Sequence, residues 1–157
     1  MRSALGDVAL RIDHIGSTAV SGLDAKPIID IQISVADFDP LDAFRLPLEG
    51  IGYVFRSDNP ERTKRYFRES PGHPRTHVHV RRSGSWAEQF ALLFRDFLRE
   101  HVEEARRYAA LKHSLAALHR TERERYTEAK EPYIWELMWR ADRWSQDVGW
   151  CVGAPDT

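Results

Sequence analysis

Apolar and polar residues alternate in short runs over the first half of the chain, and β-branched and aromatic residues are frequent within these runs. A period of two is typical of strands with one buried face. The runs predict four strands, at residues 9–15, 28–35, 53–56 and 76–82. Between them we expect short helices at 17–23 and 40–46. The segment 58–75 is rich in arginine and proline, and we expect a mobile flap with a basic hairpin around Arg65–Arg68.

The second half, from about Trp86, has the periodicity of helices. Apolar residues recur at helical spacing in two stripes: Phe90, Phe94, Phe97 and Leu98, then Tyr108, Leu111, Leu115 and Leu118. A third helix is predicted over 126–143, with Pro132 in its early part and tryptophans that we expect in a core or interface (Trp135, Trp139 and Trp144). Strands first and helices later predict an α+β fold, with a mixed β-sheet packed by helices and a helical C-terminal half.

Length and charge narrow the possibilities. At 157 residues the chain is long enough for one domain, which we place at 1–150 with a disordered tail at 151–157. The net charge is −1, from 23 basic and 24 acidic residues, and this balance disfavours nucleic acid or a membrane surface as partner. The sequence contains no signal peptide and no apolar run that could cross a bilayer. The single cysteine, Cys151, indicates a cytoplasmic setting.

Two features of the first half indicate a ligand site. A turn at Gly16-Ser17, followed by Thr18, comes directly after the first predicted strand and could offer backbone N–H groups to a phosphate. Asp30 is an isolated acid in the apolar strand 28–35, on the same face as Gln32. A carboxylate in such a place needs a metal, a cation or hydrogen-bond donors. The alternatives are an ordinary turn capped by Ser17 or Thr18 and an ion pair of Asp30 with Lys26, His79 or an arginine.

His77 and His79 share one face of the strand 76–82, about 7 Å apart. Together with Asp30, and with His14 as a further candidate, they could bind one divalent metal, of which Mg²⁺, Mn²⁺ and Zn²⁺ are the candidates. Histidine ligands favour Mn²⁺ or Zn²⁺ over Mg²⁺. His79 could also transfer a proton, so Asp30 and His79 are the candidate catalytic residues. Two histidines of a plain sheet surface are the alternative.

The segment HIGSTAVSGL followed by AKPIIDI resembles the GrpB family, also called UPF0157. The resemblance implies a fold similar to the nucleotidyltransferases of the DNA polymerase β superfamily. Their motif is Gly-Ser followed by two acids separated by one residue. Here twelve residues separate Ser17 from Asp30, and Gln32 stands where the second acid belongs. The chain also resembles the domain fused to some actinobacterial dephospho-CoA kinases. Family members usually carry a helical segment before the first strand, of which only Met1–Leu5 would remain here.

The resemblance also implies further ligand contacts. Lys26 belongs to the AKP motif, and Lys112 and Lys130 lie in helical stretches that resemble those of the family. With Gly16, Ser17 and Thr18 these lysines would bind a nucleotide or another phosphorylated small molecule. Lysines on solvent-exposed helix faces are an equally good interpretation.

Three functions therefore compete. The first is transfer of a nucleotidyl or phosphoryl group, although two of the three acids that the superfamily uses are missing. The second is a domain that binds the ligand without turnover. The third is a catalytically inactive interaction or chaperone-like module. The sequence leaves the substrate, the acceptor and the oligomeric state open.

Overall fold

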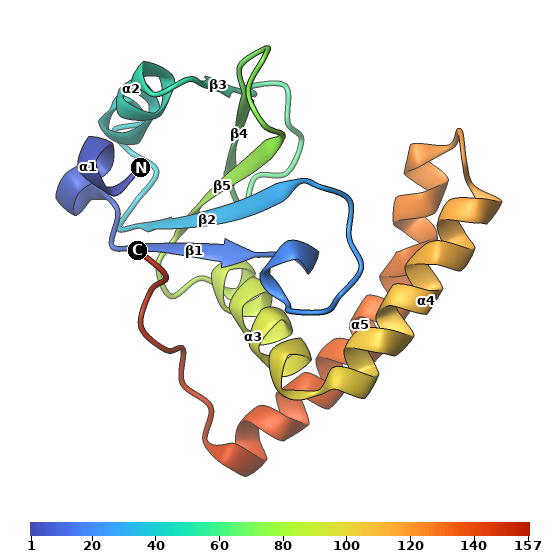
Figure 1. The fold of residues 1–157 in the computed structure, drawn as a ribbon. Helices are drawn as coiled ribbons and strands as arrows, with labels where there is room; N and C mark the ends of the chain where they lie inside the picture. Colours follow the sequence, from blue (N-terminus) through green and yellow to red (C-terminus); the bar gives the residue numbers. More distant parts are fainter.

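The computed structural model describes all residues from Met1 to Thr157. Its centre is a five-stranded sheet with the strand order β1-β2-β5-β4-β3 (Figure 1). The strands are β1 (Arg11–Ile15), β2 (Ile29–Val35), β3 (Tyr53–Phe55), β4 (Arg65–Glu69) and β5 (Thr76–Arg82). β2 and β5 are parallel and the other pairs are antiparallel, so the sheet is mixed.

The predicted strands are confirmed, and β4 adds a fifth. It lies inside the segment 58–75 that we expected to be a mobile flap, and that expectation is wrong for its centre. Phe67 of β4 is fully buried between Phe44 and Phe55, at ring distances of 6.4 and 5.1 Å. The charged residues around Phe67 hide its strand character in the sequence.

One face of the sheet is apolar and carries the first core. Ile33 and Val35 of β2, with Val78 and Val80 of β5, pack there against two short helices. These helices are α1 (Arg2–Leu5), which continues into the 3₁₀ turn η1 (Gly6–Val8), and α2 (Asp42–Gly50). The helix expected at 40–46 thus begins slightly later and continues through Pro47. Of the helix expected at 17–23, only the 3₁₀ turn η2 (Ser17–Ala19) forms.

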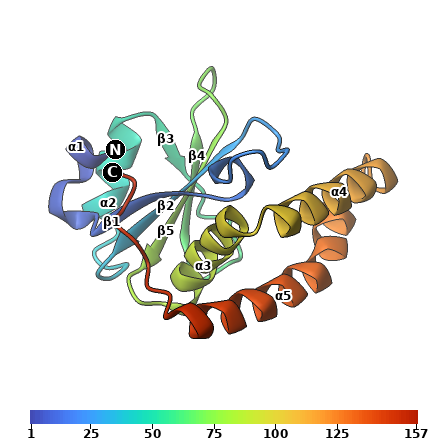
Figure 2. The same ribbon diagram turned by 60° about the horizontal axis from the view of Figure 1, so that its bottom comes forward.

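The opposite face of the sheet is polar and lies under the helical half. Three helices follow one another there: α3 (Trp86–Glu100), α4 (Val102–Leu118) and α5 (Arg123–Val148). α4 and α5 form a long antiparallel hairpin that extends beyond the edge of the sheet (Figures 1 and 2). A second core joins α3 to this hairpin, and its largest members are Phe97, Leu98, Tyr108, Leu137 and Met138. The predicted α+β architecture is therefore confirmed.

The tryptophans of the helical half have different environments. Trp144 packs on Phe97 with ring centroids 5.7 Å apart, as expected for a core aromatic. Trp135 and Trp139 are 44% and 76% exposed, so they are not core residues. No helix is both long enough and apolar enough to cross a membrane.

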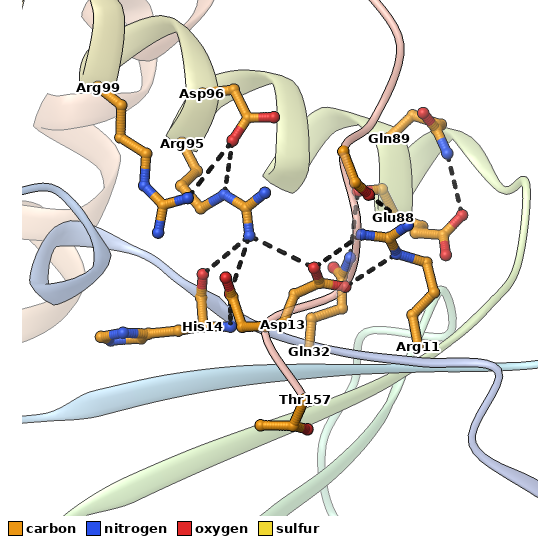
Figure 3. Close-up of polar contacts among 12 residues, drawn as sticks. Arg11, Asp13, His14, Gln32, Glu88, Gln89, Arg95, Asp96, Arg99 and Thr157 are labelled. Carbon is orange, nitrogen blue, oxygen red and sulfur yellow. Dashed lines mark hydrogen bonds and ion pairs between the residues drawn. The ribbon is translucent and has the colours of Figure 1, made fainter.

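A network of charged residues joins α3 to β1 (Figure 3). The guanidinium of Arg95, 3% exposed, donates to Asp13 Oδ1 at 3.4 Å and to the carbonyl oxygen of His14 at 3.2 Å. Asp13 is fully buried and also accepts two hydrogen bonds from Arg11, at 2.8 and 3.0 Å. The network therefore satisfies a carboxylate that would otherwise be costly to bury.

The C-terminal segment takes part in the same network. Asp156 accepts hydrogen bonds from Arg95, at 3.2 Å, and from the backbone N–H of His14, at 2.8 Å. The backbone N–H of Thr157 donates to the carbonyl oxygen of Ile12. The last residues of the chain thus lie against the free edge of β1 (Figure 1), whereas the sequence led us to expect a disordered tail at 151–157. Cys151 itself is exposed, as expected.

Candidate functional site

A cavity of about 470 Å³ lies between the polar face of the sheet and the α4–α5 hairpin. The sheet side contributes Ser17, Asp30 and His77, with the loop from Asp24 to Ile28. The hairpin contributes Tyr108, Lys112, Arg123, Tyr126 and Lys130. Residues from the strand-rich first half and from the helical second half thus meet in one cavity, which we take as the candidate site.

Asp30, His77 and His79 form a compact triad at the sheet side of this cavity. The parallel pairing of β2 with β5 places Asp30 opposite His77 and Gln32 opposite His79. Asp30 Oδ1 lies 3.1 Å from His77 Nδ1 and 3.2 Å from His79 Nε2. Tyr66 of β4 contacts both imidazoles, with ring centroids 5.7 and 5.4 Å away, and so restricts their orientation.

The triad has an unusual electrostatic environment. Burial raises the pKa of Asp30, but the hydrogen bonds from His77 and His79 outweigh burial and hold the pKa well below its usual value. Burial lowers the pKa of His79, and its hydrogen bond with Asp30 opposes this only in part. At neutral pH the site therefore contains a carboxylate next to a neutral His79.

The donor atoms suit a small divalent cation. One oxygen and two nitrogens lie within 4.8 Å of one another, and two ligands bound at about 2.1 Å with tetrahedral geometry are about 3.4 Å apart. The far ring nitrogens, His77 Nε2 and His79 Nδ1, are buried without a hydrogen-bond partner in the protein. In the metal-free protein both near nitrogens donate to Asp30 Oδ1, so each imidazole carries its proton there, and a bound metal would displace that proton. Imidazole and carboxylate ligands favour Zn²⁺ or Mn²⁺ over Mg²⁺.

Gly16 brings the turn directly against this triad. It has a φ of 71°, a conformation that side chains disfavour. A Cβ at Gly16 would lie 2.8 Å from Asp30 Oδ2, which is too close for any side chain. The residue after it, Ser17, lines the cavity and accepts a hydrogen bond from Lys112 Nζ at 3.0 Å. Lys112 also donates to the carbonyl oxygen of Asp24 at 2.7 Å, so it links the hairpin to the turn.

Lys26 and Lys130 line the same cavity, and both lie next to the ring of Tyr126. Their ammonium groups lie 5.7 and 4.6 Å from the centroid of the Tyr126 ring. Burial lowers the pKa of Lys130, and the nearby charge of Lys26 lowers it further. Burial also lowers the pKa of Lys112, which faces Lys130 as well. Cations held this close together provide a site for an anion.

Three other candidate residues lie away from the cavity. The Thr18 hydroxyl donates to the carbonyl oxygen of Ile28 at 3.2 Å and contacts His14 Nε2 at 2.8 Å. His14 is therefore on the far side of the turn and is not part of the triad. Gln32 shares the face of Asp30 as expected, but it is fully buried beneath α3. There its amide accepts from Arg81 at 2.7 Å and donates to the carbonyl oxygen of Glu88 at 3.3 Å.

Sequence reasoning missed several residues of the site. It assigned no role to Arg123, which lies near the tip of the hairpin and lines the cavity. Nor did it link Tyr66 to the histidines, although pairing of β4 with β5 sets Tyr66 opposite His79. The signal that could have revealed this strand is the apolar Phe67 between Tyr66 and Arg68, which share the opposite face.

Comparison with known proteins identifies the family. The sequence model described as GrpB protein matches residues 1–140. The chain belongs to the GrpB family. A UPF0157 protein of Pseudomonas aeruginosa is 44% identical over 145 residues, which cover 90% of this chain and 59% of the relative. The crystal structure of the conserved protein GrpB from Enterococcus faecalis superimposes with a TM-score of 0.78 and 33% identity, covering 89% of this chain and 84% of that one.

Members of the family also occur within longer proteins. A dephospho-CoA kinase of Mycobacterium tuberculosis is 35% identical over 176 residues, which cover 96% of this chain but 43% of the kinase. The chain thus spans roughly half the length of these curated relatives, 59% and 43% in the two cases. Both resemblances drawn from the sequence, to GrpB and to the domain of the kinases, are confirmed.

Proposed function

We propose that the cavity binds a nucleotide or another phosphorylated small molecule together with a divalent metal. The observation that carries this proposal is the position of the Asp30–His77–His79 triad at a cavity that also contains five lysine and arginine side chains. A triad of this kind supplies metal ligands. Lysine and arginine around it supply the positive charge that phosphate oxygens need.

The residues of the chain have separate roles in this proposal. Asp30, His77 and His79 hold the metal, and Gly16 allows the turn to approach it. Ser17, Lys26, Lys112 and Lys130 bind and orient the phosphate oxygens. A metal bound here would polarise a phosphoryl oxygen and neutralise its charge, which is the chemistry of nucleotidyl or phosphoryl transfer. Proton transfer by a neutral His79 is the alternative to its role as a metal ligand, because a nitrogen bound to a metal cannot accept a proton.

The charge of the metal site favours binding of an anionic ligand more than it favours transfer of a phosphoryl group. Asp30 is the only carboxylate of the triad, so a divalent cation bound with two neutral histidines would keep about one net positive charge. That charge favours tight binding of the anionic ligand. We therefore expect ligand binding to be easily detected and transfer with Mg²⁺ alone to be weak.

The test is a titration of the metal-free protein with Mn²⁺ and Zn²⁺ by calorimetry. Asp30→Asn should weaken binding of either metal at least tenfold, because it removes the only charged ligand. Asp24→Asn is the matched control: Asp24 lines the same cavity but pairs with His113 at 2.6 Å, outside the triad. Equal metal affinity in parent and Asp30→Asn protein would remove the metal from the proposal.

A second candidate function is an interaction module without turnover. Trp86 is 67% exposed and contacts Phe90, which in turn contacts Trp135, at ring distances of 6.0 and 5.6 Å. Trp139, one turn beyond Trp135 on α5, is 76% exposed. Exposed aromatic residues in such a group are typical of protein interfaces. Sedimentation of the parent and of Trp139→Glu over a range of concentrations tests self-association: a dimer that the substitution dissociates would support this function.

A further inference from the structure

We propose that the cavity recognises a linear chain of three or more phosphate groups and that it needs no nucleobase. This inference rests on the proposed function and narrows its ligand class. Inorganic tripolyphosphate and the triphosphate part of a nucleotide present the same chemistry to the cavity.

The first support is the charge of the cavity wall. Five cationic residues line it, namely Lys26, Arg75, Lys112, Arg123 and Lys130. The acidic residues of the wall are Asp24 and Asp30, so three positive charges remain in excess. A single phosphate group carries about 1.5 to 2 negative charges at neutral pH and would leave much of this charge unbalanced. A triphosphate carries more than one such group and can balance it, with or without a metal at Asp30.

The second support is the spread of these cations over the cavity wall. Lys112 is held on the turn by Ser17 Oγ at 3.0 Å. Lys130 lies instead over the ring of Tyr126, with Lys26 over the same ring. A compact monophosphate can contact either the turn or the Tyr126 lysines, whereas a chain of phosphates can contact both together. Burial lowers the pKa of Lys130 and the charge of Lys26 lowers it further, and this repulsion is relieved when a bound anion neutralises both lysines.

The third support is the lack of a free aromatic face for a base. Tyr108 and Tyr126 are the aromatic residues that line the cavity, apart from His77 and His113. Tyr108 is 5% exposed and packs between Phe94 and Tyr133, with ring centroids 5.5 and 6.1 Å away. The ring of Tyr126 already contacts two ammonium groups. Base stacking, which commonly anchors a nucleobase, therefore finds no tyrosine ring here that is free of other contacts.

The test is a phosphate-length series measured by calorimetry in buffer with EDTA, so that chelation of metal does not contribute. We expect tripolyphosphate to bind at least tenfold more tightly than orthophosphate, with pyrophosphate between them. ATP should bind within about threefold of tripolyphosphate, and adenosine should not bind. Lys130→Gln should weaken tripolyphosphate at least tenfold. The control, Arg106→Gln, removes the same charge from an exposed pair with Glu103 on α4 and should change binding less than twofold.

Three outcomes would overturn the inference, and the first two differ in whether the proposed function still holds. If ATP and AMP bind equally well and tripolyphosphate does not displace them, the base or ribose is recognised, and only the phosphate-chain inference fails. If no phosphate compound binds, either in EDTA or with added Mn²⁺, the proposed function fails with it. Equal effects of Lys130→Gln and Arg106→Gln would show that the positive charge acts from a distance and that no phosphate chain occupies the cavity.

Discussion

The carboxylate of Asp30 lies against the backbone of Gly16, with its Oδ2 2.8 Å from the position that a Cβ of residue 16 would occupy. This approach couples the turn after β1 to the triad on β2 and β5. The turn that offers Ser17 to the cavity and the carboxylate that would hold a metal thus share one small volume. A side chain at residue 16 would have to displace one of them.

Gly16→Ala should therefore weaken metal binding. The added methyl group would push Asp30 away from His77 and His79, and we expect the dissociation constant for Mn²⁺ to rise at least tenfold in calorimetry. Gly22→Ala is the matched control, because Gly22 has a similar φ of 75° but no atom within 4 Å of its Cβ position. It shares the backbone strain without the collision. Identical metal affinities for the two variants would show that the close approach is not needed.

Alternation along each strand was enough to predict most of the sheet and to group Asp30 with Gln32 and His77 with His79. It could not reveal the parallel pairing that brings Asp30 opposite His77, since that register depends on packing between residues 47 positions apart. It predicted a basic hairpin around Arg65–Arg68 but not that this segment is a strand inside the sheet, because charged residues flank the buried Phe67. Short-range patterns say little about such a strand until its neighbours are known.

The helical hairpin shows a second limit of the sequence. Helical spacing predicts α4 and α5 but not where their cations lie, because the angle of the hairpin to the sheet is set by the core around Phe97 and Leu137. Lys112 was expected near the ligand only through the family resemblance. The ion pair of Arg95 with Asp13 spans 82 positions, and neither residue differs in type from the many surface charges nearby.

Gln32 occupies the position of the missing second acid, and the structure predicts that restoring an acid there has little effect on metal binding. Gln32 is fully buried and its amide is already bonded to Arg81 and to the backbone of Glu88. A carboxylate at residue 32 would pair with Arg81 beneath α3. We expect Gln32→Asp to bind Mn²⁺ within threefold of the parent in the same calorimetric assay. A gain of tenfold or more would mean that residue 32 can reach the metal.

Arg95 should be one of the strongest single contributors to stability. Removing it leaves Asp13 fully buried with Arg11 as its remaining charged partner. Breaking a buried ion pair from one side typically costs about 3–5 kcal/mol, so we expect Arg95→Ala to lower the free energy of unfolding by about that amount, measured by urea denaturation. Arg106→Ala serves as the comparison, since exposed pairs contribute about 0–1 kcal/mol. If Arg95→Ala and Arg106→Ala lower the free energy of unfolding equally, the network of Figure 3 contributes no more stability than an exposed ion pair.

The affinity for phosphate should begin to fall at a lower pH than it would if the lysines of the site had their ordinary pKa. Burial lowers the pKa of both Lys112 and Lys130, so their ammonium groups lose protons below the usual lysine pKa of about 10.4. Only the charged form attracts phosphate, and tripolyphosphate affinity should fall as the pH rises from neutral toward that value. A bound anion favours the ammonium form, so binding in this range should take up protons.

Calorimetry in two buffers of different ionisation enthalpy measures that uptake. In the Lys112→Arg/Lys130→Arg variant the guanidinium groups stay charged, and both the alkaline loss and the proton uptake should disappear. An unchanged pH profile in that variant would assign the titration to other groups.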